Sequence, residues 1–97
     1  MARVPLPYTT QNNLTHEISM KRANLIAEKN GIKVNIRDVE EELAEYCSIS
    51  RDAIVLIKRG INQPSLAVAL KISEYFGKDV REIFGLVHDE EGDKESK

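Results

Sequence analysis

Apolar residues in the middle of the chain recur every three or four positions, the spacing that gives an α-helix one buried face. Two such runs follow each other, and their apolar members are Ile36, Val39, Leu43 and Cys47, then Ile49, Ile54 and Ile57. Ser50 precedes the second run and Gly60 follows it; these residue types cap helix N-termini and follow helix C-termini. The pattern predicts two short helices joined by a tight turn, the first starting near Asn35 and the second spanning about 50–59.

A further helix is predicted before this pair, from about Thr15 to Asn30, with Thr15 as its cap and Gly31 after its last turn. Its apolar spacing predicts a buried face made of Ile18, Leu25 and Ile26, with Met20 or Ala23.

Two more helices are predicted after the pair. Ser65 can cap a helix over Leu66–Phe76, whose apolar side is expected to consist of Leu66, Ala69, Leu70, Ile72 and Phe76. Asp79 and Glu82 form a capping-box pattern for a short last helix that ends in Ile83 and Phe84.

The expected fold class is therefore all-α, with a compact five-helix domain over residues 15–84. Residues 1–14 contain prolines and paired asparagines, which favour an extended N-terminal arm. Residues 85–97 are polar and acidic and predict a flexible, disordered tail. No sequence pattern typical of a β-strand is longer than the short run 32–36. The chain has 97 residues with 41% hydrophobic content, which suits a single small core.

The segment from Leu43 to Phe84 resembles the lambda-repressor-like, Xre-type helix-turn-helix family. The residues that carry the resemblance are Leu43-Ala44, Ile49-Ser50-Arg51, Ile54, Ile57, Arg59-Gly60, Pro64-Ser65-Leu66, Val80, Ile83 and Phe84. In helix-turn-helix proteins the second helix of the pair enters the DNA major groove. The resemblance implies a sequence-specific DNA-binding transcriptional regulator, expected to be a repressor of bacterial or phage type.

The same resemblance implies which side chains meet DNA. The expected base-contacting residues are Arg51, Asp52, Val55 and Leu56, and the expected backbone-contacting residues are Ser50, Lys58, Arg59, Asn62 and Gln63. Arginine can form two hydrogen bonds with guanine, and valine can contact a thymine methyl group. Asp52 can accept a hydrogen bond from cytosine or stabilise the helix N-terminus through the dipole, and we favour the second role.

Members of this family commonly bind near-palindromic double-stranded DNA as homodimers. The resemblance therefore implies two half-sites about 34 Å apart. The candidate dimer surfaces are the last helix, Ile61 and the acidic tail.

The sequence also departs from the family at several positions. Val39 and Glu40 stand where the family usually has a small hydroxyl cap and a glutamine that touches DNA. Ala27 and Lys58 replace both members of a usual arginine–acid pair, so neither charge is left without its partner. The run Glu40–Glu42 is interpreted as a solvated helix face.

The net charge of −2 is unusual for a DNA-binding protein, because neutralising phosphates supplies much of the affinity. The acids are concentrated at the end, however: residues 1–84 have twelve basic and eleven acidic residues, a net charge of +1. This weak positive charge predicts modest non-specific binding to DNA, or a partner that is not DNA.

No catalytic or metal-binding pattern stands out. His16 and His88 are far apart in sequence, and Cys47 lies on an apolar helix face. No apolar run approaches the roughly 18 residues of a membrane span, and the N-terminus lacks the apolar middle of a secretory signal. We therefore expect a cytoplasmic protein that is not an enzyme and needs no cofactor or metal.

One feature favours a different function. Residues 53–57 are apolar at five consecutive positions, so Val55 or Leu56 is expected on the outside of the second helix. Adjacent exposed apolar groups often mark a protein contact. The alternative is a helix-turn-helix fold that binds a protein through Val55 and Leu56 or through the acidic tail, as an anti-repressor, an antitoxin or a partner of a polymerase or repressor, with weak or no DNA binding.

Overall fold

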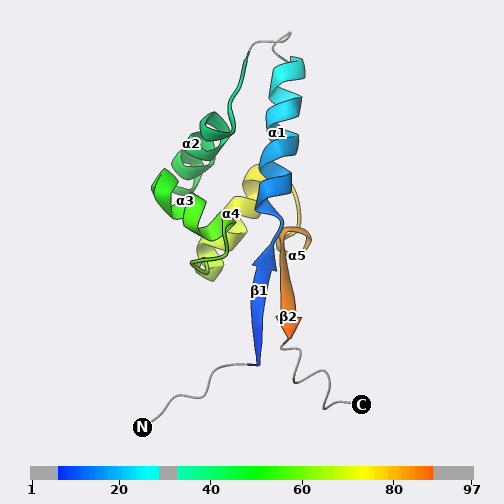
Figure 1. Ribbon diagram of the computed structural model, residues 1–97, viewed down its shortest axis with the longest axis vertical. Coiled ribbons are helices and arrows are strands. Elements are labelled where there is room, and N and C mark those ends of the chain that lie inside the picture. Colours follow the sequence, from blue (N-terminus) through cyan, green and yellow to red (C-terminus); the bar gives the residue numbers. More distant parts are fainter. Residues whose placement is uncertain (1–6, 29–32, 89–97) are drawn as a thin grey trace.

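The computed structural model describes residues 7–28 and 33–88. In chain order the elements are β1 (Tyr8–Asn12), α1 (Leu14–Glu28), α2 (Ile36–Cys47), α3 (Arg51–Lys58), α4 (Leu66–Phe76), α5 (Val80–Ile83) and β2 (Phe84–His88). Figure 1 shows the helices gathered in one body, with the two strands projecting from it as a narrow ribbon. Five helices are thus present in the described ranges, as the sequence pattern predicts.

The predicted caps account for the ends of the later helices. Ser50 Oγ accepts a hydrogen bond from the Ala53 amide at 3.0 Å, and Gly60 adopts φ 77° after the last turn of α3. Ser65 does the same for α4, and Gly77 at φ 67° ends that helix. Helix α1 begins at Leu14, so Thr15 lies inside the helix and the prediction of Thr15 as its cap is wrong. The predicted end of that helix, Asn30, lies outside the described residues.

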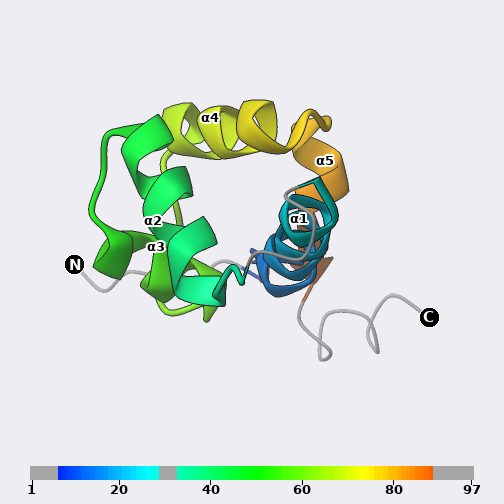
Figure 2. The ribbon, with the colours of Figure 1, turned by 90° about the horizontal axis from the view of Figure 1, so that it is seen from above.

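The helices enclose one apolar core. Its buried residues come from every helix: Leu14, Ile18, Val39, Leu43, Ala44, Ile54, Ile57, Ala69, Ile72 and Ile83. Figure 2, which looks along the molecule from above, shows α2 and α3 on one side, α4 across the next side and α1 with α5 opposite. No helix of the described ranges is both long and apolar enough to cross a membrane.

The predicted apolar side of α4 is wrong at two positions. Leu66 and Leu70 are 72% and 50% exposed. The core side of the helix is centred on Ala69, Ile72 and Ser73, and Leu70 lies two residues before Ile72, nearly opposite it at 3.6 residues per turn. On α1, Met20 and Ala23 are likewise both exposed. An apolar side chain on one of these short helices is therefore not always a core residue.

The two strands correct the predicted all-α class. Strand β1 comes from the expected arm. Strand β2 starts at Phe84, the predicted last residue of the final helix, and includes residues 85–88 of the tail predicted to be disordered; residues 89–97 lie outside the described ranges. The strands pair antiparallel from Tyr8↔His88 to Asn12↔Phe84. Each strand has only five residues, and its partner lies at the other end of the chain. Neither strand can therefore be recognised from a local pattern. The Asn12 side chain ties the ribbon to the body by donating to the Ile57 carbonyl at 2.8 Å.

Candidate nucleic-acid interface

A three-residue turn sets the angle between α2 and α3. Ser48 adopts the left-handed conformation at φ 60°, and the next amide, Ile49, donates to the Ala44 carbonyl at 3.0 Å. Glycine or asparagine usually occupies such a position, so a serine gives no sequence signal for it. Half-buried Ile49 packs against the core, and Ser50 then caps α3. The turn thus holds α3 against α2 as a helix-turn-helix unit.

The residues predicted to contact DNA differ in exposure. Asp52 is exposed, while Arg51, Val55 and Leu56 are half-buried along α3. In the predicted backbone-contacting group, Lys58 is half-buried and the others are exposed: Ser50, Arg59, Asn62 and Gln63. Both groups lie on α3 or in the turns that flank it.

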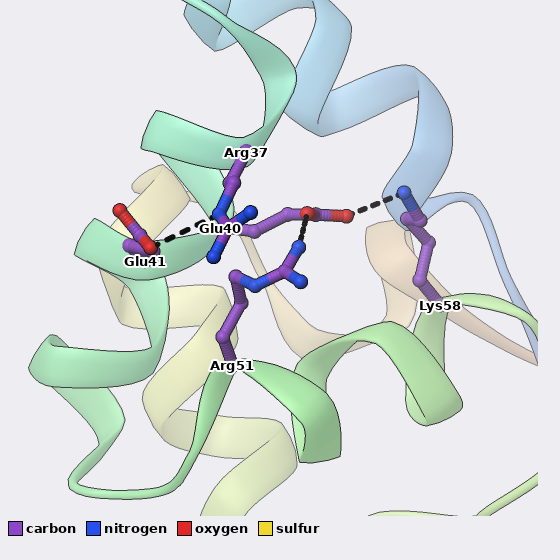
Figure 3. Close-up of polar contacts among 5 residues, drawn as sticks. All are labelled: Arg37, Glu40, Glu41, Arg51 and Lys58. Carbon is purple, nitrogen blue, oxygen red and sulfur yellow. Dashed lines mark hydrogen bonds and ion pairs between the residues drawn. The ribbon is translucent and has the colours of Figure 1, made fainter.

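A buried carboxylate joins the two helices of the unit. Glu40 on α2 is 3% exposed and accepts hydrogen bonds from Arg51 Nη1 at 3.0 Å and from Lys58 Nζ at 2.5 Å. Figure 3 shows the Glu40 side chain reaching between these two groups, which come from opposite ends of α3. The two cations are seven residues apart, so they share one face of the helix at a separation of two turns. One acid thereby orients both.

The interpretation of Glu40 as part of a solvated face is wrong. Glu40 lies four residues after Ile36 and three before Leu43, on the apolar side of α2, and its position in that period is the signal that predicts burial. A buried carboxylate is tolerated when charged partners satisfy its oxygens. The neighbouring Glu41 does lie in solvent, where it pairs with Arg37 at 3.3 Å (Figure 3).

The ion pairs leave donors on both cations. A guanidinium carries five N–H donors and an ammonium three. Glu40 engages Arg51 through Nη1, and it takes one hydrogen bond from Lys58. The side chains of Arg51 and Lys58 remain 30% and 19% exposed. Each can therefore bind a second acceptor without leaving Glu40.

The polar groups of the loop after α3 make two kinds of contact. The backbone amides of Ile61 and Asn62 both donate to the Leu56 carbonyl, at 2.9 and 3.2 Å, and so close the end of α3. The Gln63 side chain instead reaches β1, where it bonds to Thr9 and Thr10. Of the two loop side chains predicted to contact phosphate, Gln63 is thus already engaged within the chain.

The apolar surface on which the protein-binding alternative depends is small. Val55 and Leu56 are both half-buried, and neither is among the large exposed apolar side chains of the described ranges. The more exposed apolar groups on or near this unit are Tyr46 on α2, Ile61 in the loop and Leu66 at the start of α4. Helix α3 itself therefore presents mixed polar and apolar groups.

Comparison with known proteins identifies the unit. The helix-turn-helix family model matches residues 38–83. An uncharacterised HTH-type transcriptional regulator of Methanocaldococcus jannaschii is 39% identical over 51 residues, which are 53% of this chain and 77% of the relative. The chain belongs to the helix-turn-helix family of transcriptional regulators. A second such regulator, from Archaeoglobus fulgidus, is 38% identical over 52 residues, covering 54% of this chain and 70% of the relative.

This membership confirms the predicted Xre-type family and its DNA-binding, regulatory character. Both relatives are archaeal, whereas the resemblance pointed to the bacterial and phage type. The family match begins within α2 and ends at the last residue of α5. The matched residues therefore do not include α1, β1 or β2.

Within the described ranges, no three His, Cys, Asp or Glu side chains are grouped so that they can hold a metal ion. Burial raises the pKa of the Cys47 thiol, which disfavours the reactive thiolate. Cys47 packs against the core as the sequence pattern predicts.

Proposed function

We propose that this regulator is a repressor that acts as those of bacteria and phages do, by binding operator DNA through α3 and blocking transcription from it. The observation that carries the proposal is the set of three cations on a family-matched helix-turn-helix unit, Arg51, Lys58 and Arg59, two of them oriented by buried Glu40. Oriented donors lose less conformational entropy when they bind.

Base recognition is proposed for the first two turns of α3. Arg51 keeps free donors while Glu40 holds Nη1, and those donors suit the O6 and N7 acceptors of guanine. Val55 and Leu56 can contact thymine methyl groups. Asp52 lies in the first turn of the helix, where its charge is favourable to the helix dipole, and it can also accept from cytosine.

Phosphate binding is proposed for the residues around the two ends of α3. Ser50 Oγ accepts from Ala53, which leaves its hydroxyl hydrogen to donate to a phosphate. At the other end of α3, the proposed phosphate-binding residues are Lys58, Arg59 and Asn62. Gln63 joins them only if its amide leaves β1, so it is the weakest member of the group. Two phosphate-binding cations predict a slope of log affinity against log salt of about −2 per half-site.

We further propose that the regulator binds double-stranded DNA as a homodimer. Two copies of α3 would then occupy major grooves about 34 Å apart, on half-sites related by a two-fold axis. A near-palindromic operator is the expected target.

Selection from a randomised duplex pool, repeated at two salt concentrations, tests the proposal. The expected result is enrichment of a near-palindromic site whose affinity falls as salt rises. Arg51→Ala should relax the preference at one base pair per half-site, by about 1–3 kcal/mol, while Lys58→Ala weakens all sequences alike and reduces the salt slope by about 1 per half-site.

Lys71→Ala is the matched control, because Lys71 is an exposed lysine on α4. It should leave both the preference and the slope unchanged. Helical content by circular dichroism shows whether each variant is folded. Folded Arg51→Ala and Lys58→Ala variants that bind all DNA like the parent protein would overturn the assignment of α3.

A further inference from the structure

The two edges of the β1–β2 ribbon differ. The Gln63 side chain contacts Thr9 Oγ1 at 3.5 Å, the Thr10 carbonyl at 3.4 Å and the Thr10 hydroxyl. Neighbouring residues of a strand point to opposite faces, so a side chain that reaches both threonines must lie at the edge between the faces. Because β2 occupies the other edge of β1, Gln63 covers the outer edge.

No described residue covers the outer edge of β2 in this way. The Phe84 amide bonds to the Val80 carbonyl at the end of α5. Beyond that bond and the pairing with β1, no hydrogen bond from the described residues reaches the backbone of β2. Figure 1 shows β2 on the side of the ribbon away from α3 and α4. An unpaired edge exposes N–H and C=O groups that can pair with another strand.

The usual protection against such pairing is also missing. Natural edge strands are commonly guarded by lysine, other charges or proline. The strands Tyr8–Asn12 and Phe84–His88 contain no Asp, Glu, Lys, Arg or Pro, although 31% of the whole chain is charged. They expose apolar groups instead: Tyr8 is 43% exposed, Leu86 61% and Val87 36%. A two-stranded ribbon with so little burial is marginal by itself.

We propose that β2 pairs antiparallel with β2 of a second copy of this chain, making a four-stranded sheet in the order β1–β2–β2–β1 across a two-fold axis. An uncharged strand suits its own copy, because no like charges meet when identical strands are apposed. Residues that lie directly opposite each other in an antiparallel pair point to the same face of the sheet. One residue of β2 must therefore lie opposite its own copy on the two-fold axis, and that residue is Gly85, Leu86 or Val87. In each of these registers Leu86 lies opposite or diagonal to its own copy.

This inference deepens the proposed function by assigning the homodimer contact, and it rests on that function only for the expectation of two-fold symmetry. The last helix and Ile61 are among the candidate dimer surfaces predicted from the sequence; we now propose the adjacent strand β2 as the main dimer contact instead. Five residues from each copy make an interface below the roughly 1,200 Å² of stable complexes. The dimer should therefore form reversibly, at high protein concentration.

Sedimentation of the full chain over a range of concentrations, without DNA, tests the contact. The parent protein should show a reversible monomer–dimer equilibrium. Leu86→Lys and Leu86→Glu should each raise the dimer dissociation constant about tenfold or more, because like charges then face each other. An equal mixture of these two variants should recover dimers, since opposite charges now meet. Leu66→Lys, the same change at another exposed leucine, should leave the equilibrium unchanged.

Three results would overturn the proposal: a parent protein that stays monomeric at every concentration, a mixture that fails to recover dimers, or a dimer lost in Leu66→Lys and kept in Leu86→Lys. If Leu86→Lys lowers helical content, Val87→Lys on the opposite face replaces it. Since no DNA is present, failure of the operator proposal leaves this result intact. Conversely, failure of the dimer test leaves the assignment of α3 to DNA intact, because Arg51→Ala and Lys58→Ala test that assignment separately.

Discussion

The α2–α3 unit and the β1–β2 ribbon are stabilised in opposite ways. The unit is built from adjacent residues, with a capped helix at each end of its turn, buried apolar residues and a buried ion cluster. The ribbon joins the two ends of the described chain, buries little and is tied to the body by a few polar contacts. The first region therefore supplies stability, whereas the second is the region that we propose as the contact with a second copy.

The largest expected difference between the two regions concerns stability. Leu43→Ala removes a fully buried side chain and should lower the free energy of unfolding by about 2–5 kcal/mol. Leu86→Ala changes a side chain that is 61% exposed and should cost within about 0.5 kcal/mol. Urea unfolding followed by circular dichroism, at a concentration where the chain is monomeric, measures both. Equal losses would contradict the contrast.

The second prediction compares two acids on the same helix. Glu40→Gln takes a charge from a buried cluster and should destabilise the protein by about 1–3 kcal/mol, because Arg51 and Lys58 lose their shared partner. Glu41→Gln breaks a solvent-exposed pair with Arg37 and should cost at most about 0.5 kcal/mol. The same unfolding measurement separates them, and a larger effect at Glu41 would refute the assignment of the cluster.

A smaller effect is expected where the ribbon meets the loop. Gln63→Ala removes exposed hydrogen bonds to β1 and should lower global stability by less than about 1 kcal/mol. It should nevertheless speed amide exchange in β1 while leaving α3 unchanged, because the ribbon opens locally. Exchange followed by NMR, with Asn62→Ala as the neighbouring control, tests this. Unaltered exchange in β1 would show that Gln63 does not secure the strand.

The smallest expected effect concerns the rate at which the Cys47 thiol reacts. Burial raises the pKa of the Cys47 thiol, so at a given pH a smaller fraction is thiolate than in an unfolded chain. Alkylation at mildly alkaline pH should therefore be slower in the native protein than in urea, and its rate should rise at higher pH than that of a free cysteine. A native rate equal to the denatured rate would mean that the unit opens readily around Cys47.

Local signals predicted much of the fold and little of the contact pattern. The ends of α3, α4 and α5 follow from Ser50, Ser65 and Asp79, because a cap involves residues only two or three positions apart. The candidate DNA-contacting residues came from a resemblance, and their roles remain a proposal. The burial of Glu40 was predictable in principle from its place in the apolar period, but its charge led to the opposite interpretation.

The sequence by itself determined the helices, their caps and the helix-turn-helix unit, since helical periodicity and capping act within a few residues. Tertiary structure alone decided which charges of different helices meet and which strands pair. Glu40 finds Lys58 across 18 positions of sequence, Gln63 finds Thr10 across 53, and β1 finds β2 only when the helices bring the chain ends together. Such contacts depend on how whole elements pack, and no local pattern encodes that packing.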